Sequence, residues 1–327
     1  MAMLEVNNIC KNGKEVYAVT NVSFSQQLGE KVAIAGETGS GKTTLLKMIG
    51  GLTQPDSGNI LFKGSKVIGP FDQLIPGHAG IAYLSQHFEL RNNYRVHEIL
   101  EYANKISETA ALNLYKLCRI EHLLERRTDQ LSGGEKQRIA LAKLLTGLPK
   151  LLLLDEPFSN LDAVHRNIIK SVINDISNKL KIDCIMVSHD AADVLSWADT
   201  ILVLKEGKLI QKDNPKSIYS NPVNEYCAGL FGPYNLLQEA LSSNIKALYN
   251  LKDDNRQMLL RPEHLSLAAT GHEALQGRVE KILYWGSYYT VEILNEQQLI
   301  TVYACQPNVS IGDSVYLSIE PAKITWM

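Results

Sequence analysis

The stretch KVAIAGETGSGKT, residues 31–43, decides the fold of this chain. Its first five residues form a short apolar run that is typical of a buried β-strand, and a helical pattern begins at Lys42. Between them lies the segment Gly36 to Thr43, which matches G-x-x-x-x-G-K-[ST] in the strand–turn–helix context that this pattern requires. The sequence therefore predicts a phosphate-binding loop rather than a glycine-rich turn that carries a lysine by chance.

The composition of this loop follows from the chemistry of phosphate binding. Gly39 and Gly41 allow the backbone to curl, so that successive N–H groups and the positive end of the following helix point at phosphate oxygens. Lys42 adds a mobile cation for the β- and γ-phosphates of a nucleotide, and the Thr43 hydroxyl is suited to ligate Mg²⁺. The residues expected at this nucleotide site are Gly36, Glu37, Thr38, Gly39, Ser40, Gly41, Lys42, Thr43 and Thr44.

The rest of the first 230 or so residues alternates short apolar runs with helical patterns, which predicts an α/β fold with a mainly parallel sheet. Between Arg95 and Leu124 the apolar spacing becomes helical, and we expect a small helical lobe inserted into the sheet domain. The further runs expected to be buried strands are Ile81 to Ser85, Leu151 to Leu154, Cys184 to Ser188 and Ile201 to Leu204.

Two adjacent carboxylates, Asp155 and Glu156, follow one of these strands. Because successive strand residues point to opposite sides, the two acids should not share one role. Asp155 is placed to hold the Mg²⁺ shell, and Glu156 is placed beyond the γ-phosphate, where it can orient and polarise an attacking water. An apolar run that ends in two acids is commonly structural, but downstream of a phosphate loop the catalytic interpretation is favoured.

A third motif, LSGGEKQR at residues 131–138, opens a helix. Ser132 is placed as the N-cap, and Glu135 three residues later completes a capping box. Gly133 and Gly134 lower helix stability, and they make sense where a ligand must approach the backbone closely. We interpret this segment as a second anion-binding helix N-terminus.

LSGGEKQR resembles the signature motif of the ATP-binding-cassette (ABC) ATPases, and the other marks of that family occur in the family's order. Gln86, in YLSQ, resembles the glutamine that contacts Mg²⁺ and the attacking water. Asp162, in SNLD, resembles the end of the loop that crosses the dimer interface. His189, in VSHD, resembles the switch histidine that contacts the γ-phosphate, although for His189 alone a satisfied buried histidine is the competing interpretation.

The resemblance covers nearly the whole chain and implies a P-loop NTPase (RecA-like) core in which two copies pack head to tail. ATP would lie between the Gly36–Thr43 loop of one copy and the helix start of the other. It implies Mg²⁺ held by Thr43, Gln86 and Asp155, catalysis by Glu156, His189, Gln86 and Lys42, and contacts from the second copy by Ser132, Gly133, Gly134 and Asp162. Relatives stack the adenine on an aromatic residue near the place of Asn12 and Gly13 here; Tyr17 is the nearest aromatic, and this contact stays open.

The residue pattern changes near residues 231–233. Beyond this point, runs that alternate apolar and polar residues are separated by glycines, and this pattern predicts a small β-barrel or sandwich. LRPEH at residues 260–264 and GRV at 277–279 resemble the oligomer-binding (OB)-fold-like TOBE domain of bacterial importer ATPases. We predict an ABC domain at 1–232, with its helical lobe at about 88–130, and a TOBE/OB-like domain at 233–327. Arg261 and His264 form either a ligand site or a surface salt bridge.

The function class follows from what is absent as well as from the motifs. The net charge of −2 argues against nucleic acid as a partner. About ninety residues separate Lys42 from Ser132, which leaves no room for the long coiled coil of the chromosome-maintenance and repair ATPases that share these motifs. One motif set is present, unlike the fused pairs of translation-associated members. Import rests on the TOBE resemblance, and an exporter cassette would share every catalytic residue.

The five cysteines are scattered and predict free thiols in a reducing compartment, and no signal peptide or membrane-spanning stretch is apparent. We therefore expect a cytoplasmic protein that is peripheral on the cytoplasmic face of the inner membrane. The implied partners are a second copy, transmembrane permease subunits and an extracytoplasmic solute-binding protein. The helical lobe and the Gln86 loop should form the groove that receives a short permease helix.

Overall fold

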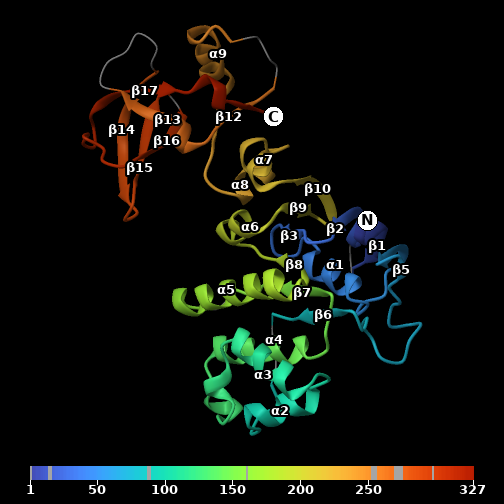
Figure 1. Ribbon diagram of the computed structural model, residues 1–327. Helices are drawn as coiled ribbons and strands as arrows, with labels where there is room; N and C mark the ends of the chain where they lie inside the picture. Colours follow the sequence, from blue (N-terminus) through green and yellow to red (C-terminus); the bar gives the residue numbers. More distant parts are fainter. Residues whose placement is uncertain are drawn as a thin grey trace. The chain divides into compact units, whose positions relative to one another are not determined.

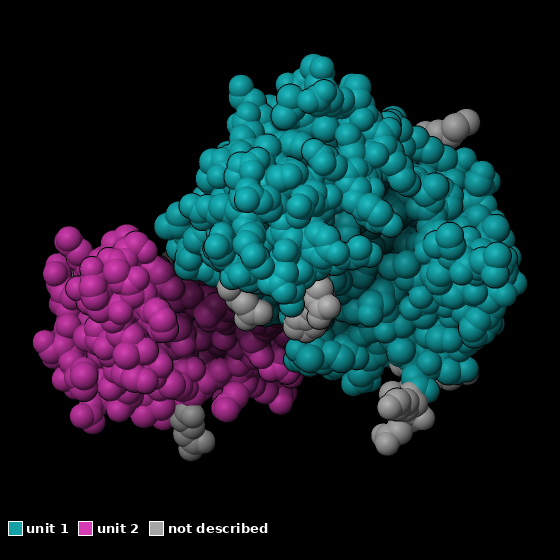
Figure 2. Space-filling model, turned by 90° about the horizontal axis from the view of Figure 1, so that it is seen from below, with its two compact units in different colours: residues 1–215 teal, residues 216–327 magenta. Residues whose placement is uncertain are grey.

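The computed structural model divides the chain into two compact units, Met1–Pro215 and Lys216–Met327 (Figures 1 and 2). The structure describes residues 2–13, 17–86, 90–159, 161–251, 256–268, 275–296 and 298–327. Each unit has its own buried apolar core.

A six-stranded sheet forms the centre of the first unit, with the strand order β10-β9-β3-β8-β7-β6. Neighbouring strands are parallel except for the edge pair β10 and β9. The apolar runs of the sequence predicted five of these strands to within a residue at each end. The strands are β3 (Lys31–Ala35), β6 (Ile81–Leu84), β7 (Leu151–Asp155), β8 (Asp183–Val187), β9 (Thr200–Lys205) and β10 (Lys208–Asp213).

Side chains of this sheet alternate between two cores, so both faces are covered. In β7, Leu151 and Leu153 pack in the core that contains α1 (Lys42–Ile49), whereas Leu152 and Leu154 pack in the core that contains α4 (Gly133–Leu145) and α5 (Ala163–Leu180). The short helix α6 (Ala191–Trp197) follows β8. The P-loop therefore leaves the sheet at the end of β3 and enters a helix whose apolar face is fully buried.

A second, antiparallel sheet completes the α1 side of the unit and was not predicted from the sequence. Its order is β2-β1-β4-β5, and the pairing of β1 with β2 contains several register shifts. Each shift interrupts the alternation of apolar and polar residues, so the strands carry no clean period of two. The strands are β1 (Ala2–Asn12), β2 (Tyr17–Gln27), β4 (Ser57–Phe62) and β5 (Ser65–Lys66).

The predicted helical lobe lies in the chain between β6 and α4 and is drawn in green-blue in Figure 1. It contains α2 (Val96–Ala103), α3 (Glu108–Leu117) and two short 3₁₀ turns, η1 (Glu121–Leu123) and η2 (Thr128–Gln130). Its apolar residues share a core with α4 and α5. The structure thus confirms the helical spacing expected between Arg95 and Leu124.

The second unit is built mainly of antiparallel strands, as predicted. A five-stranded sheet has the order β13-β17-β14-β15-β16, and β13 also lies beside β16, so the sheet curls on itself as in an OB-like barrel. A small sheet, β11-β12-β18, and three helices accompany it. The elements from α7 onward are α7 (Pro215–Ser220), α8 (Glu225–Leu230), β11 (Asn235–Leu236), α9 (Glu239–Leu248), β12 (Met258–Leu260), η3 (Pro262–His264), β13 (Leu265–Ala268), β14 (Leu275–Tyr284), β15 (Tyr289–Asn295), β16 (Gln298–Ala304), β17 (Ser314–Ile319), η4 (Pro321–Lys323) and β18 (Thr325–Trp326).

Arg261 joins the helical start of this unit to its strands. Its side chain is 1% exposed, and its guanidinium donates to the backbone carbonyls of Ala228, Gly232, Pro233 and Tyr219 at 3.0 to 3.1 Å. It also stacks on the Tyr219 ring, with 4.2 Å between its Cζ and the ring centroid. The alternative of a surface salt bridge is therefore wrong, because the residue is buried and its donors serve carbonyl oxygens.

These carbonyls lie in and after α7 and α8, which precede the boundary predicted at 232/233. By packing, the compact units divide at 215/216. The predicted boundary between the two family domains stays a prediction.

We predict that Arg261→Lys lowers the unfolding free energy of the second unit by about 2 to 4 kcal/mol, because a lysine cannot serve four carbonyls with a planar fork and leaves some of them buried without a donor. Denaturant unfolding followed by tryptophan fluorescence measures this unfolding free energy, since Trp285 and Trp326 lie in the second unit. Arg278→Lys is the control: Arg278 is two-thirds exposed, and its replacement should change stability by no more than about 0.5 kcal/mol. Equal effects of the two substitutions would contradict the role of Arg261.

Candidate functional site

The lysine of the P-loop is enclosed by its own loop. The Lys42 ammonium donates to the carbonyl oxygens of Gly36 and Glu37 at 2.7 and 2.6 Å, and Ser40 Oγ lies 3.4 Å away. Burial lowers the pKa of Lys42, while the nearby charges of Glu156, Asp155 and Glu37 act in the opposite direction. The predicted loop therefore curls around a cation that is 7% exposed.

All three glycines of this loop have positive φ: Gly36 at +154°, and Gly39 and Gly41 in the left-handed helical region. Gly39 has φ +85° and Gly41 has φ +98°. A Cβ on Gly41 would lie 2.1 Å from the carbonyl oxygen of Ala18, whereas a Cβ on Gly39 would meet no heavy atom within 4 Å. Gly41, the N-cap of α1, is thus required both by conformation and by the close approach of β2.

Asp155 at the end of β7 accepts two hydroxyl hydrogen bonds. The Thr43 hydroxyl donates to Oδ1 at 3.0 Å, and the Tyr83 hydroxyl donates to Oδ2 at 2.7 Å. Asp155 is 3% exposed. The pKa of Tyr83 lies far above its usual range, mainly because the phenol is buried and secondly because it faces the Asp155 carboxylate. The phenol therefore remains a donor. Three neighbouring elements, α1, β6 and β7, are joined at one carboxylate.

The sequence analysis did not identify Tyr83. In the parallel pairing of β6 with β7, Tyr83 lies opposite Leu153, two residues before Asp155, so both side chains are on the same face. A tyrosine three residues before Gln86 was the available signal, but it has meaning only once β6 and β7 are known to be neighbours.

Glu156 turns away from Asp155 and meets the histidine at the end of β8. Its backbone has φ +52°, and its N–H donates to the Val187 carbonyl at 3.0 Å. His189 Nδ1 lies 2.5 Å from Glu156 Oε2. The His189 side chain is 64% exposed, so it is not the buried histidine of the competing interpretation. The two acids have separate partners.

The helix start at Ser132 is built as a capping box, as predicted. The Glu135 backbone N–H donates to Ser132 Oγ at 3.3 Å, and the Ser132 N–H donates to Glu135 Oε2 at 2.8 Å. In the described part of the chain the hydrogen bonds of Ser132 go to Glu135 and Lys136 and not to the P-loop. Among the described residues, the capping box at this second helix N-terminus therefore shares no hydrogen bond with Lys42 or with the loop residues that surround it.

Two further predicted residues lie in loops. Asp162 is the N-cap of α5, where it accepts from His165. Gln86 follows β6 and is exposed. Asn160, in the predicted interface loop, lies outside the described residues, as do the three residues after Gln86. The side chain of Tyr17, the open candidate for the adenine contact, is also outside them.

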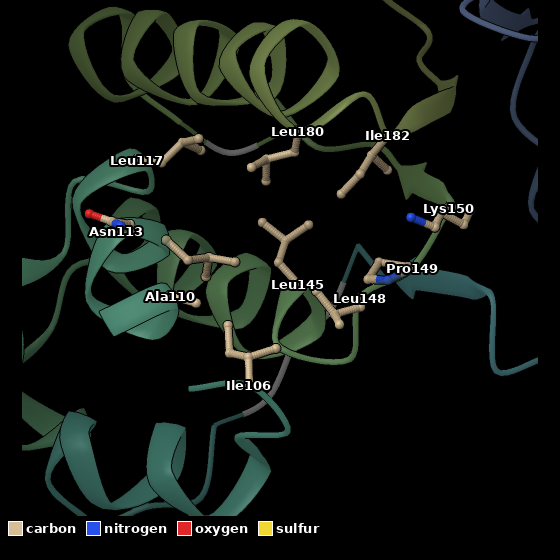
Figure 3. Close-up of a pocket in the computed structure, with 11 residues that line it drawn as sticks. Ile106, Ala110, Asn113, Leu117, Leu145, Leu148, Pro149, Lys150, Leu180 and Ile182 are labelled. Atoms are coloured by element: carbon tan, nitrogen blue, oxygen red, sulfur yellow. The ribbon is translucent and has the colours of Figure 1, made fainter. Parts of the chain in front are cut away.

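A deep apolar cavity of about 360 Å³ lies in the first unit between α3, α4 and α5, and Figure 3 shows aliphatic side chains converging on it. It contains none of the predicted site residues. The nucleotide chemistry therefore does not belong to this cavity. Its lining is Ile106, Ala110, Asn113, Leu114, Leu117, Leu145, Leu148, Pro149, Lys150, Leu180 and Ile182.

No helix within the described ranges combines the length and the apolar character needed to cross a membrane. The described residues also hold no cluster of three or more histidine, cysteine or acidic side chains that would bind a metal by themselves.

Comparison with known proteins identifies both units. The profile of the ABC transporter family matches residues 19–159, and the TOBE domain profile matches residues 258–327. The chain is 32% identical to the sulfate/thiosulfate import ATP-binding protein CysA of Gloeobacter violaceus, over 98% of this chain and 94% of that protein. It is 31% identical to the glucose import ATP-binding protein GlcV of Saccharolobus solfataricus, over 98% and 96%.

Solved structures agree with the fold of the first unit. cbiO1 from Clostridium perfringens, part of the ABC transporter complex cbiONQ, superposes with a TM-score of 0.59 at 29% identity, over 66% of this chain and 90% of that chain. A dimeric ATP-binding cassette in a post-hydrolysis state, bound to ADP and Pi, gives 0.56 at 27% identity, over 65% and 99%. The P-loop NTPase core and the OB-like second unit are confirmed.

Relatives above 30% identity thus match this chain from end to end, and the two profiles occur in the order in which the structure places its α/β and β units. The chain belongs to the ABC transporter family, as an ATP-binding ATPase subunit of the import type.

Proposed function

We propose that this chain binds Mg²⁺-ATP between two head-to-tail copies of itself and couples hydrolysis to solute import through separate permease subunits, on the cytoplasmic face of the cell membrane. The single observation that carries the proposal is the grouping of Lys42, Thr43, Asp155, Glu156 and His189 at one end of the parallel sheet. This is the end of the sheet at which open α/β folds bind ligands.

The residues at the Asp155 end of β7 fit Mg²⁺. A hydroxyl and a carboxylate oxygen 3.0 Å apart are the hard oxygen ligands that this ion prefers, and Mg²⁺ bound with nucleotide takes only one or two carboxylates. We assign Thr43 and Asp155 as ligands, with Gln86 as the third, and Tyr83 as the residue that holds Asp155 in place. When bound, the ion neutralises charge on the β- and γ-phosphates.

The loop residues Gly36 to Thr44 would hold the phosphates through their backbone N–H groups. Lys42 would exchange its carbonyl partners for phosphate oxygens. The exchange is favourable because a buried cation is stabilised by negatively charged partners. Glu156 would accept a proton from the attacking water, and His189 would orient the Glu156 carboxylate through the bond at 2.5 Å.

The second copy would complete this site with the start of its α4. Ser132 would bring its hydroxyl, Gly133 its backbone N–H in the first turn of α4, and the helix its positive end, which is where a phosphate binds favourably. The dimeric cassette with ADP and Pi, a similar structure, supports two copies. Asp162 lies in the loop that would face the partner copy. We also assign the cassette domain to 1–232 and the TOBE/OB-like domain to 233–327.

A permease helix has a suitable surface on the first unit. One cavity of about 420 Å³ is bordered by Tyr94 and Tyr102 of the helical lobe, which are 45% and 83% exposed, and by Arg91 and Lys143. A separate groove of about 630 Å³ is lined by Leu144 of α4 and by residues of the segment between β5 and β6. We assign this surface to a short amphipathic permease helix.

The choice of solute is assigned to other subunits. Relatives named for import of sulfate or thiosulfate, glucose, Fe(3+) ions and spermidine or putrescine are similar to this chain over nearly its whole length. Proteins that differ in solute thus share one motor, so we place selectivity in the permease and in an extracytoplasmic solute-binding protein.

We predict that Glu156→Gln slows ATP turnover by about 10²- to 10⁴-fold while ATP binding persists, because the amide cannot accept the proton of the water. The variant should also accumulate as an ATP-bound dimer, measured by size-exclusion chromatography with multi-angle scattering. Glu280→Gln, at an exposed position of the second unit, is the control and should hydrolyse at the parent rate. Parent turnover in Glu156→Gln would refute the assignment.

We predict that Gly41→Ala weakens ATP binding at least about tenfold, equivalent to about 1.4 kcal/mol, since its Cβ would displace the Ala18 carbonyl and with it the loop. Gly39→Ala is the matched control: it shares the left-handed conformation but meets open space, so it should cost less. Titration with a fluorescent ATP analogue measures both. Equal affinities in the two variants would show that the close approach of β2 does not shape the loop.

We predict that Tyr102→Ser reduces co-purification of the chain with its permease at least about fivefold, because an exposed aromatic anchor of this kind contributes on the order of 1 kcal/mol or more to an interface. Tyr284→Ser, at a 66% exposed position in the second unit, is the control, and ATP affinity verifies folding of both variants. Undiminished capture of the permease by Tyr102→Ser would remove the lobe from the docking surface.

A further inference from the structure

His165 contacts the two segments of the first unit that would face the second copy. It is the third residue of α5, and its backbone N–H donates to Asp162 Oδ1 at 2.9 Å. Its Nδ1 lies 2.6 Å from Asp162 Oδ2. Because a carboxylate only accepts, Nδ1 is the donor in this bond, and one residue thus holds both oxygens of Asp162. The two bonds lower the pKa of Asp162.

The same imidazole packs on the start of α4. A Cβ added to Gly134 would lie 2.8 Å from His165 Cδ2 and 3.1 Å from its Cβ and Cγ. Gly134 is not among the residues with positive φ, so its backbone would accept alanine, and it is the ring that excludes one. A Cβ on Gly133, by contrast, would meet no heavy atom of this chain within 4 Å.

Glycine is therefore favoured at the two positions of LSGG for different reasons. Gly133 opens onto free space on its own chain, which fits the approach of a ligand. Gly134, which has no side chain, leaves room for the His165 ring to pack against the start of α4. The expectation that both glycines admit a ligand is thus corrected for Gly134.

We propose that His165 is a positioning residue that couples the start of α4 to the Asp162 loop, so that both meet the second copy and its nucleotide in one fixed arrangement. The inference rests on the proposed dimeric site. The bond to Asp162 is partly exposed, and such a pair contributes little stability by itself. Its effect lies in pre-organisation: displacement of a positioned group by about 1 Å costs up to about 10²-fold in rate.

His165→Ala separates this role from a merely structural one. The variant keeps the backbone N–H bond to Asp162 Oδ1 but loses the imidazole from both the Asp162 and the Gly134 contact. We expect ATP-driven dimer formation in the Glu156→Gln background, and kcat in the parent, to fall about 10- to 100-fold. The affinity of the monomeric chain for ATP should remain within twofold, because His165 touches no residue of the Gly36–Thr43 loop. If only the cap of α5 matters, the melting temperature falls while dimerisation and kcat stay at the parent values, which would overturn the proposal.

His165→Asn is the conservative variant and guards against misfolding of the alanine variant. The Asn Nδ2 takes the place of the ring Nδ1 and keeps a donor for Asp162, and its Oδ1 takes the place of the ring atom Cδ2 beside Gly134, so that only the outer ring atoms Cε1 and Nε2 are lost. We expect this variant to form the ATP dimer more strongly than His165→Ala and more weakly than the parent. A dimer as weak as that of His165→Ala would overturn the proposal, because this variant keeps a group at both contacts.

A double-mutant cycle tests the contact with Gly134 directly. In the Glu156→Gln background, Gly134→Ala should weaken the ATP dimer at least about fivefold more when His165 is present than when it is alanine, since alanine lacks the ring atoms Cδ2 and Cγ that the new Cβ would meet at 2.8 and 3.1 Å. Gly133→Ala is the matched control, and its effect should be the same with either residue at position 165, within about twofold.

The outcomes separate this inference from the proposed function. If Glu156→Gln forms no ATP dimer at all, the dimeric site itself is wrong. If it forms the dimer but the effects of Gly134→Ala and His165→Ala multiply independently, the site stands and the coupling by His165 is refuted.

Discussion

The Asp155 carboxylate joins three elements that are distant in sequence. Thr43 reaches it from the first turn of α1, Tyr83 reaches it from β6, and the carboxylate itself ends β7. Since Asp155 is almost completely buried, its two oxygens require donors, and both donors are hydroxyls that a bound cation can replace or share. The two carboxylate oxygens of Asp155 thus link the register of β6 with β7 to the position of α1, which follows the P-loop. The Lys42 cluster, Glu156 and His189 are arranged around that point.

The catalytic half of the site could be predicted from the sequence because its parts are local. Each part is a strand end or a helix start with a short motif, and the apolar runs that precede the motifs lie in the parallel sheet where the pattern placed them. β3 matches its predicted range at both ends. The capping box at Ser132 was equally local and is present. Their catalytic and metal-binding roles rest on the proposed function.

The remaining features depend on pairing between segments that are distant in sequence. Tyr83 acquires its partner only because β6 lies beside β7, and the His165 ring meets Gly134 only because α5 packs on α4. The sheet of β1, β2 and β4 was missed because register shifts erase its alternation. The sequence left Arg261 as either a ligand site or a surface salt bridge, yet its side chain is among the most buried of its unit. Four carbonyls in and after the helices α7 and α8 accept its hydrogen bonds.

The central claim is that each nucleotide is enclosed by the P-loop of one copy and the α4 start of another. Its most direct measurement mixes two variants that each also carry Glu156→Gln: Lys42→Ala, which disables the loop, and Ser132→Arg, which blocks the helix start. In a mixed dimer one composite site keeps both intact parts. We expect that neither variant alone retains ATP in a dimer, whereas the mixture forms an ATP-bound dimer. A mixture that stays monomeric, or retention of enclosed ATP by one variant on its own, would contradict it.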